Sequence, residues 1–261
     1  TEDVFFKAEN FSRWLSPDPL AEKFPWHSPY VFCSNNPVNR IDPDGRADFW
    51  HNGRVIGNDG VDDQRILVIK TTQKSFGSEA DGNLVPGAGL SRKDLNATVK
   101  FIKNNSGNSQ AFQDNGMAYT NSIAIESSAE NRQVMVDEVS GKGRDDGRGG
   151  TTDANNREYG GSIQDGVVVP AEPGSVAVPG EGATASIMLP VGYSTFHSHP
   201  SGYTETHSWS QTPSPTDINN AGGHTNYVFG RSRSSSNNVY IYNSNGVQAV
   251  IPMRYFVNPR R

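Results

Sequence analysis

Short runs of β-branched and aromatic residues, many of them alternating with polar residues, recur along the chain between turns rich in glycine, proline and asparagine. A period of two residues is typical of β-strands, whose successive side chains point to opposite faces. The pattern predicts strands at 55–56, 65–70, 121–126, 132–139, 160–169, 183–189, 192–198, 226–230, 238–243 and 247–251. Asp165-Gly166 and Asn245-Gly246 are typical hairpin turns.

The clearest helical pattern covers residues 91–104, where one apolar stripe is formed by Leu95, Val99 and Ile102. Ser91 suits the N-cap of this helix, with Asp94 three residues later. The stripe indicates ordinary core packing.

A short helix is predicted at about 215–221. Ser214, Pro215 and Asp217 fit the N-cap, the first turn and the third position of a capping-box variant. Residues 141–156 are almost free of apolar residues and predict a loop. Many short strands and few helices together predict an α+β fold.

The composition narrows the class of protein. Only 34% of residues are apolar, and 27 glycines and 16 prolines interrupt regular structure, which excludes a helical bundle or a coiled coil. No stretch approaches the roughly 18 apolar residues of a membrane span. The one cysteine, Cys33, excludes an internal disulfide framework and a cysteine-rich zinc site. A start at Thr1 without methionine or leader indicates a piece of a longer protein that lacks its export signal.

The net charge of −5 is spread unevenly along the chain. Residues 157–261 carry six arginines, no lysine and six acidic residues, so their net charge is zero. Binding to a phosphate backbone normally needs a dense positive face. Nucleic acid is therefore an unlikely partner, although metal nucleases with small basic grooves stay open.

The first 45 residues are dense in prolines and aromatic residues and contain four distinctive motifs, at Arg13–Leu20, Ser28–Tyr30, Asn35–Asn39 and Asp42–Gly45. In this order the motifs resemble the end of an Rhs/YD-repeat core, which closes a β-cocoon around a C-terminal toxin. The resemblance implies that residues 1–45 are the irregular, proline-rich tail of that core and that a variable toxin tip follows.

Self-cleavage just beyond Gly45 stays open. Some relatives use aspartates of this segment for it, but Arg46 stands where leucine is commoner. Asp42 and Asp44 also suit turns for local reasons.

The segment Thr195-Phe196-His197-Ser198-His199-Pro200 carries the candidate chemistry. On a strand, residues two apart face the same way, so His197 and His199 project side by side, as chelation of one metal ion requires. A third ligand is needed, and the one aspartate that follows the pair is Asp217.

His-x-His-Pro followed by Ser-x-x-Asp resembles the JAMM motif of the JAB/MPN metalloprotease fold. The resemblance covers about residues 120–255 and implies a curved β-sheet with packed helices, close to the JAB-like toxin domains found as polymorphic toxin tips. It also implies a glutamate on an earlier segment, ahead of a small-residue pair, and Glu158 before Gly160-Gly161 fits that pattern.

The resemblance implies a role for each of these residues. His197, His199 and Asp217 would bind Zn²⁺, and Glu158 would accept a proton from water and return it to the leaving amine. Ser214 would donate a hydrogen bond to the oxyanion of the tetrahedral intermediate. The chain is thus expected to be a secreted toxin, delivered into a target cell, that acts as a JAMM-type zinc peptidase or isopeptidase on protein substrates.

Two residue assignments have rivals. Glu126 competes with Glu158, because sequence spacing does not show which carboxylate meets the metal. The motif is also interrupted by 13 residues, 201–213, a longer interval than is usual in the family. This segment brings Glu205 and His207 near the expected metal, but an ordinary polar loop is the favoured interpretation of both residues.

The expected organisation has three parts: the Rhs core end at 1–45, a linker and N-terminal part of the tip at 46–119, and the JAB-like domain at 120–261. The expected partners are a cognate immunity protein, the Rhs shell of the parent chain and a protein substrate. Two other functions stay open: a catalytically inactive JAB-like binding module and a metal-dependent nuclease.

Overall fold

The computed structural model describes residues 47–61, 63–79, 82–231 and 237–260. Residues 46–261 form one compact unit. The Rhs-like motifs, including Asp42 and Asp44, lie outside the described residues, as does Cys33. None of the helices among the described residues is long and apolar enough to cross a membrane.

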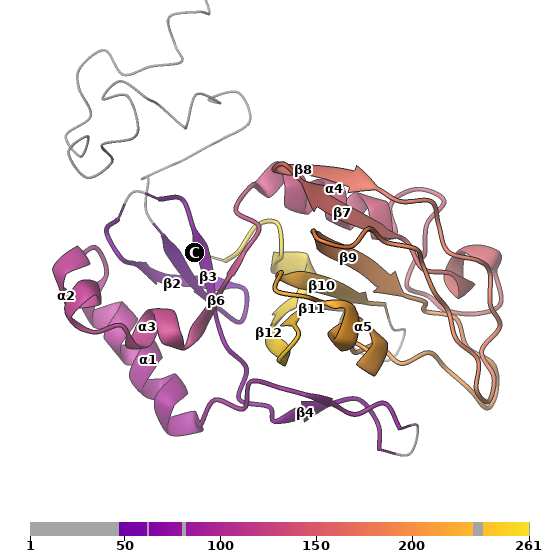
Figure 1. The fold of residues 1–261 in the computed structure, drawn as a ribbon, viewed down its shortest axis with the longest axis horizontal. Coiled ribbons are helices and arrows are strands. Elements are labelled where there is room, and N and C mark those ends of the chain that lie inside the picture. Colours follow the sequence, from indigo (N-terminus) through magenta and orange to yellow (C-terminus); the bar gives the residue numbers. More distant parts are fainter. Residues whose placement is uncertain (1–46, 62, 80–81, 232–236, 261) are drawn as a thin grey trace, which may run out of the picture. The chain divides into compact units, whose positions relative to one another are not determined.

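The described chain is a mixture of strands and helices (Figure 1), in keeping with the expected α+β class. The strands are β1 (Asp48–His51), β2 (Arg54–Asn58), β3 (Ile66–Ile69), β4 (Ser75–Phe76), β5 (Val85–Pro86), β6 (Ser122–Ile125), β7 (Gly160–Gln164), β8 (Val167–Pro170), β9 (Ser194–His199), β10 (Asn226–Gly230), β11 (Asn238–Asn243) and β12 (Gly246–Pro252). The helices are α1 (Arg92–Asn105), α2 (Ser109–Asp114), α3 (Met117–Thr120), α4 (Ala129–Ser140) and α5 (Pro215–Asn220), with 3-10 turns at Asp153–Asn156 and Met253–Tyr255.

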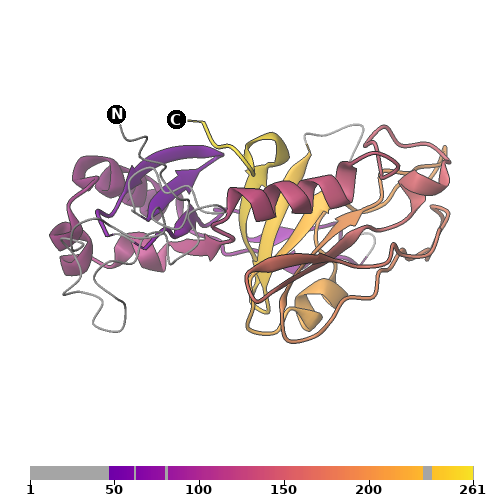
Figure 2. The ribbon, with the colours of Figure 1, turned by 90° about the horizontal axis from the view of Figure 1, so that it is seen from above.

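The larger sheet has the order β12-β11-β10-β9-β7-β8. Its strands pair antiparallel except β9 and β10, which are parallel and are connected through α5. Helix α4 lies along one face of this sheet, against β7, β8 and β9 (Figure 2). A strand in this position is covered on both faces, which explains why β9 is buried from Phe196 to its end at His199.

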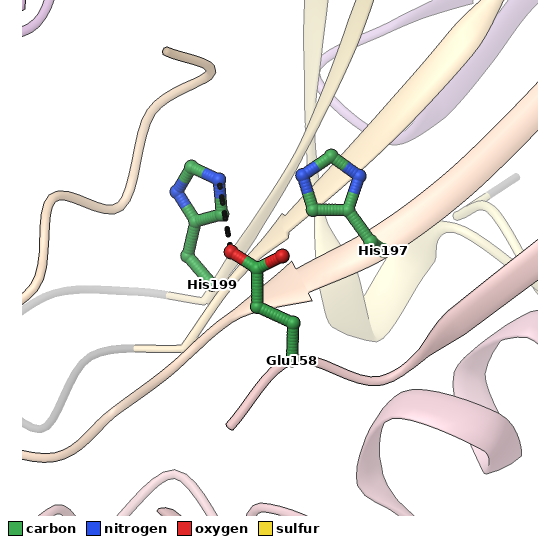
Figure 3. Close-up of side chains that lie close together, drawn as sticks. All are labelled: Glu158, His197 and His199. Atoms are coloured by element: carbon green, nitrogen blue, oxygen red, sulfur yellow. Dashed lines mark ion pairs between the residues drawn. The ribbon is translucent and has the colours of Figure 1, made fainter. Parts of the chain in front are cut away.

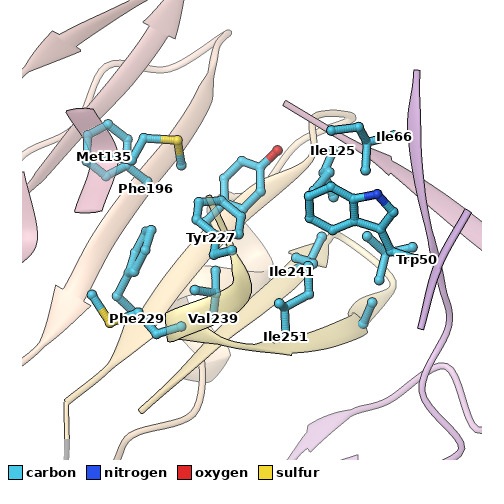
Figure 4. Packing of buried hydrophobic residues seen from close by; sticks show 14 of the residues in the cluster. Trp50, Ile66, Ile125, Met135, Phe196, Tyr227, Phe229, Val239, Ile241 and Ile251 are labelled. Atoms are coloured by element: carbon cyan, nitrogen blue, oxygen red, sulfur yellow. The ribbon is translucent and has the colours of Figure 1, made fainter. Parts of the chain in front are cut away.

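A smaller sheet has the order β2-β1-β3-β6. Helices α1 to α3 directly precede β6 in the sequence. Strand β6 pairs antiparallel with β3. The JAB-like domain was expected to begin at residue 120, so its first strand completes a sheet whose other strands come earlier in the sequence. The main apolar core contains residues of both sheets (Figure 4), including Trp50, Ile66, Ile125, Tyr227, Phe229, Val239, Ile241 and Ile251. The region 46–119 therefore contributes strands and core residues to the compact unit.

Most predicted elements are confirmed within one or two residues. Ser91 caps α1, and its hydroxyl accepts the N–H of Asp94. The region 160–169 forms a β7–β8 hairpin that turns at Asp165-Gly166. Helices α2 and α3 were not predicted, and β1, β4 and β5 were expected only as unlocated short strands within residues 46–90, because each of these elements is short and lacks a sustained period.

The predicted strand at 132–139 is wrong, because these residues form most of α4. Alternating valines at 134 and 136 favoured a strand, but the residues that are buried are Arg132, Met135 and Val139, at helical spacing. Ser128 accepts the N–H of Asn131 and so caps the helix. Packing against the sheet has overridden the β-propensity of the valines.

The predicted strand at 183–189 is also wrong. Half-buried and exposed side chains do alternate along this segment, and Met188 is 91% exposed. No ladder forms there, however, and the sheet ends at β8. Alternation alone does not make a strand without a partner for the backbone.

The assignment of α4 predicts a difference between two adjacent residues. We expect Met135→Ala to lower the free energy of unfolding by about 2–5 kcal/mol, because this side chain is fully buried against the sheet. Val134→Ala, at a position 42% exposed, should cost less than about 1 kcal/mol. Urea unfolding of both variants measures the difference, and equal losses would contradict the helical register.

Candidate metal centre

Strand β9 carries the two candidate histidines on one face. In its parallel register with β10, Phe196 pairs with Tyr227 and Ser198 with Phe229, and these aromatic residues belong to the core that α4 covers. His197 and His199 alternate with them and so point to the opposite face. Both imidazoles are buried, 3% and 7% exposed, with ring centroids 5.2 Å apart.

Glu158 comes from the segment that leads into β7, on the other side of β9. Gly160 pairs with His197, so the antiparallel register carried back two residues places Glu158 opposite His199. The Ser198 N–H donates to the Tyr159 carbonyl at 2.7 Å and holds this extension of the ladder together. The Glu158 carboxylate points toward the imidazoles (Figure 3), with Oε1 4.0 Å from His199 Nε2.

Close approach of β7 to its two neighbouring strands, β9 and β8, requires Gly160 and Gly161. A Cβ on Gly160 would lie 2.1 Å from the Phe196 carbonyl oxygen and 2.8 Å from His197 Cα. A Cβ on Gly161 would lie 2.3 Å from the Val169 carbonyl oxygen. Since these obstacles are mostly backbone atoms, no side-chain movement relieves them. Each glycine therefore has a physical role: Gly160 lets the segment that carries Glu158 reach β9, the strand that carries the histidines, and Gly161 lets β7 reach β8.

Asp217 reaches the same place from α5, the helix between β9 and β10. Ser214 and Asp217 form the predicted capping box, with both reciprocal hydrogen bonds present. Asp217 Oδ2 accepts from the Ser214 N–H at 2.6 Å and from the Ser214 hydroxyl at 2.7 Å. Its Oδ1 lies 3.3 Å from His197 Nε2, and its Oδ2 lies 3.5 Å from His199 Nε2. The helix cap thus orients the carboxylate toward both imidazoles.

The histidine–aspartate contact shifts the pKa values of both groups. Burial acts to lower the pKa of His197, but the Asp217 carboxylate outweighs burial and raises it to about 9. Burial acts in the opposite sense on Asp217, and the two imidazoles outweigh it and hold the pKa of this carboxyl well below its usual range. The negative charge of Asp217 is therefore retained beside the two imidazoles, in a site that is largely closed to water.

The two imidazoles differ in the hydrogen bonding of their Nδ1 atoms. His199 Nδ1 lies 2.9 Å from the carbonyl oxygen of Ser210, which can only accept a hydrogen bond. This contact places the proton of a neutral His199 on Nδ1 and leaves the Nε2 lone pair free for a ligand. His197 Nδ1 is buried without a hydrogen-bond partner in the described part of the chain.

Among the described residues, Glu158, His197 and His199 form a buried group whose ligand atoms all lie within 4.8 Å of one another, and this group can hold a metal ion. Asp217 contacts both histidines of the group. Imidazole nitrogens and carboxylate oxygens are donors that divalent transition metals accept. The residues present therefore fit a metal centre.

The rival residues do not join this group. The Glu126 carboxylate accepts the Ser128 N–H at 2.8 Å, at the start of α4. Glu205 and His207 are exposed, and His207 Nδ1 lies 2.7 Å from the Thr206 hydroxyl oxygen. The contact of the Ser210 carbonyl with His199 could not be predicted from residue patterns, because any residue type can contribute a backbone acceptor.

Comparisons of the chain with family models, with curated proteins and with solved structures find no match.

Two histidines of different exposure offer a matched test of the metal centre. We expect His197→Ala to reduce bound divalent metal from about one ion per chain to near zero after dialysis, because the group loses a buried ligand. His207→Ala should leave the metal content unchanged, since His207 is exposed on the loop. Metal analysis by mass spectrometry decides the matter, and equal metal content in the two variants would contradict the buried site.

The glycine next to Glu158 predicts a second contrast. Gly160→Ala should lower the free energy of unfolding by about 1–3 kcal/mol, because the added methyl group pushes β7 away from β9. Gly223→Ala is the control, since a Cβ there meets no atom within 4 Å and the change should stay below about 1 kcal/mol. Both are measured by urea unfolding, and a neutral Gly160→Ala would refute the close approach.

Proposed function

We propose that residues 46–261 are a zinc-dependent peptidase or isopeptidase of the JAB/MPN type, forming the toxin tip of an Rhs-type protein. The observation that carries this proposal is the convergence of Glu158, His197 and His199 in one buried group, with Asp217 against both histidines. These residues come from three separate segments. They match, residue by residue, the pattern expected from the JAMM-like motif.

We assign His197, His199 and Asp217 as the zinc ligands. Asp217 lies nearer to the imidazoles than Glu158 does, and the capping box fixes its carboxylate before any ion binds. Two nitrogens and one oxygen in a buried site leave a coordination position for water, as in catalytic zinc sites. When bound, zinc acts as a Lewis acid and lowers the pKa of water to about 7.

Glu158 is the proposed general base. Its carboxylate is buried beside His199 without the helix-cap hydrogen bonds that hold Asp217. A carboxylate in this position takes a proton from the attacking water and returns it to the leaving amine. The pairing of β7 with β9 keeps it beside the imidazoles, where water and a substrate carbonyl would meet.

Ser214 has a position that supports orientation of Asp217 more directly than donation to an oxyanion. Its hydroxyl donates its one proton to Asp217 Oδ2 and accepts the Asp217 N–H. Donation to an oxyanion, the role that the family resemblance implies, would need this hydroxyl to turn away from Asp217. We therefore propose that Ser214 orients the ligand in the resting site.

The delivery part of the proposal rests on the sequence motifs of residues 1–45. An Rhs-like core end followed by a metalloprotease-like tip supports a secreted toxin that is carried into a target cell. A producing cell needs protection from such a toxin, so we include a cognate immunity protein among the partners.

Glu158→Gln separates catalysis from metal binding. We expect the variant of the full chain to keep about one zinc per chain and to lose hydrolysis by about 10²–10⁴-fold, because an amide cannot accept the proton. The readouts are metal analysis, growth of cells that express the chain, and proteomics of those cells for new protein termini. Glu172→Gln is the control at an exposed glutamate and should be fully active.

The other outcomes identify the rival functions. A Glu158→Gln variant that binds zinc and stays fully toxic would favour a binding module over an enzyme. Degradation of plasmid DNA by the purified chain, blocked by a chelator, would favour a nuclease. Loss of zinc in Glu158→Gln but not in Asp217→Asn would reverse the assigned roles of the two acids.

A further inference from the structure

The long segment between the two halves of the metal motif has two parts. In its outer part the Thr204 N–H donates to the His207 carbonyl, and Tyr203 forms an isolated bridge with Ser208. This small hairpin carries the exposed residues Glu205 and His207. The inner part, Trp209 to Gln211, returns to the sheet and includes Ser210, whose carbonyl contacts His199 Nδ1.

Gln211 connects this inner part to the ends of two strands. Its amide Nε2 donates to the Pro200 carbonyl at 2.9 Å and to the Trp209 carbonyl at 3.0 Å. Its Oε1 accepts the N–H of Arg231, the residue that follows β10. One side chain therefore joins the end of β9, the loop and the end of β10. The two loop residues in these hydrogen bonds, Trp209 and Gln211, are the neighbours of Ser210 in the sequence.

The contact with β10 is close enough to fix the position of the loop. Gly230 pairs with His199, and a Cβ on Gly230 would lie 2.8 Å from the Gln211 carbonyl oxygen. The Trp209 indole N–H adds a hydrogen bond to Asn156 Oδ1 at 3.3 Å. The loop thus lies directly against the strand pair that carries His199.

The start of the segment is held equally firmly. Asp145 is fully buried, and its carboxylate accepts the N–H of Ser201 at 2.6 Å and the Ser201 hydroxyl at 2.5 Å. The Gly202 N–H donates to the Asn155 carbonyl at 2.7 Å. Both ends of the segment are therefore anchored to buried groups, and its exposed hairpin lies between the anchors.

We propose that Gln211 is a positioning residue for the metal centre: it holds the Ser210 carbonyl where that oxygen fixes the tautomer and the ring orientation of His199. The proposal rests on the metal centre proposed above and gives the inserted segment a role in that centre. Outer partners of this kind orient a ligand, and their loss typically costs metal affinity without removing any ligand atom.

The test uses the full chain with Gln211→Met, which keeps the length of the side chain and removes its hydrogen bonds. Zn²⁺ affinity is measured by competition with a chromophoric chelator, and we expect it to fall by roughly 10–100-fold. The absorption bands of the Co²⁺-substituted protein should also shift, because the orientation of His199 changes the ligand field. Gln110→Met, at an exposed glutamine of α2, is the control and should match the wild type in both readouts.

The outcomes separate this proposal from the metal centre itself. If the wild type binds zinc and Gln211→Met binds it within twofold with an unchanged Co²⁺ spectrum, the positioning role is refuted and the metal centre stands. If the wild type binds no zinc, both are refuted. If Gln211→Met does not fold, Gln211→Glu decides, because it keeps an acceptor for the Arg231 N–H and removes both donations from Nε2: weaker zinc binding supports the proposal, and wild-type binding overturns it.

Discussion

The candidate site depends on the close pairing of β7 with β9. This pairing is possible because Gly160 has no side chain to collide with the β9 backbone. It places Glu158 opposite His199 and keeps His197 on the same face, while Phe196 on the other face packs in the core. A strand fixed on both faces has no freedom to slip, since a shift of one residue would put the imidazoles into the apolar core.

Burial of the charged groups imposes a second constraint. A buried carboxylate is costly unless it is paired and hydrogen-bonded, and Asp217 meets both conditions through the helix cap and the two histidines. The cap does this with groups of α5 itself, so Asp217 is oriented by local structure. Glu158 is oriented by a long-range strand pairing. The two acids of the site are thus positioned by different physical means, in agreement with different roles.

The local parts of this site were predictable from spacing along the chain, whereas the long-range parts were expected only from the family resemblance. Alternation along one strand placed His197 and His199 together, and the Ser-x-x-Asp pattern predicted the cap of α5, because both depend on residues a few positions apart. The choice between Glu158 and Glu126 depended on which distant strands pair, which no spacing shows. Helix α4 was mistaken for a strand for a related reason: its valines favour a strand locally, and only the sheet that it covers decides which face is buried.

The inserted segment shows how a long loop is compatible with a well-ordered site. The entropy cost of closing a loop grows only slowly with its length, so additional residues are tolerated when their ends are fixed. Here Asp145 fixes one end through Ser201, and Gln211 fixes the other, while the hairpin between them remains at the surface. Glu205 and His207 look most like additional metal ligands in the sequence, and both lie in that hairpin. The group of this segment that contacts His199 is instead the backbone carbonyl of Ser210. Chemical character alone therefore points to the wrong part of this segment, because the anchors decide which atoms reach the histidines.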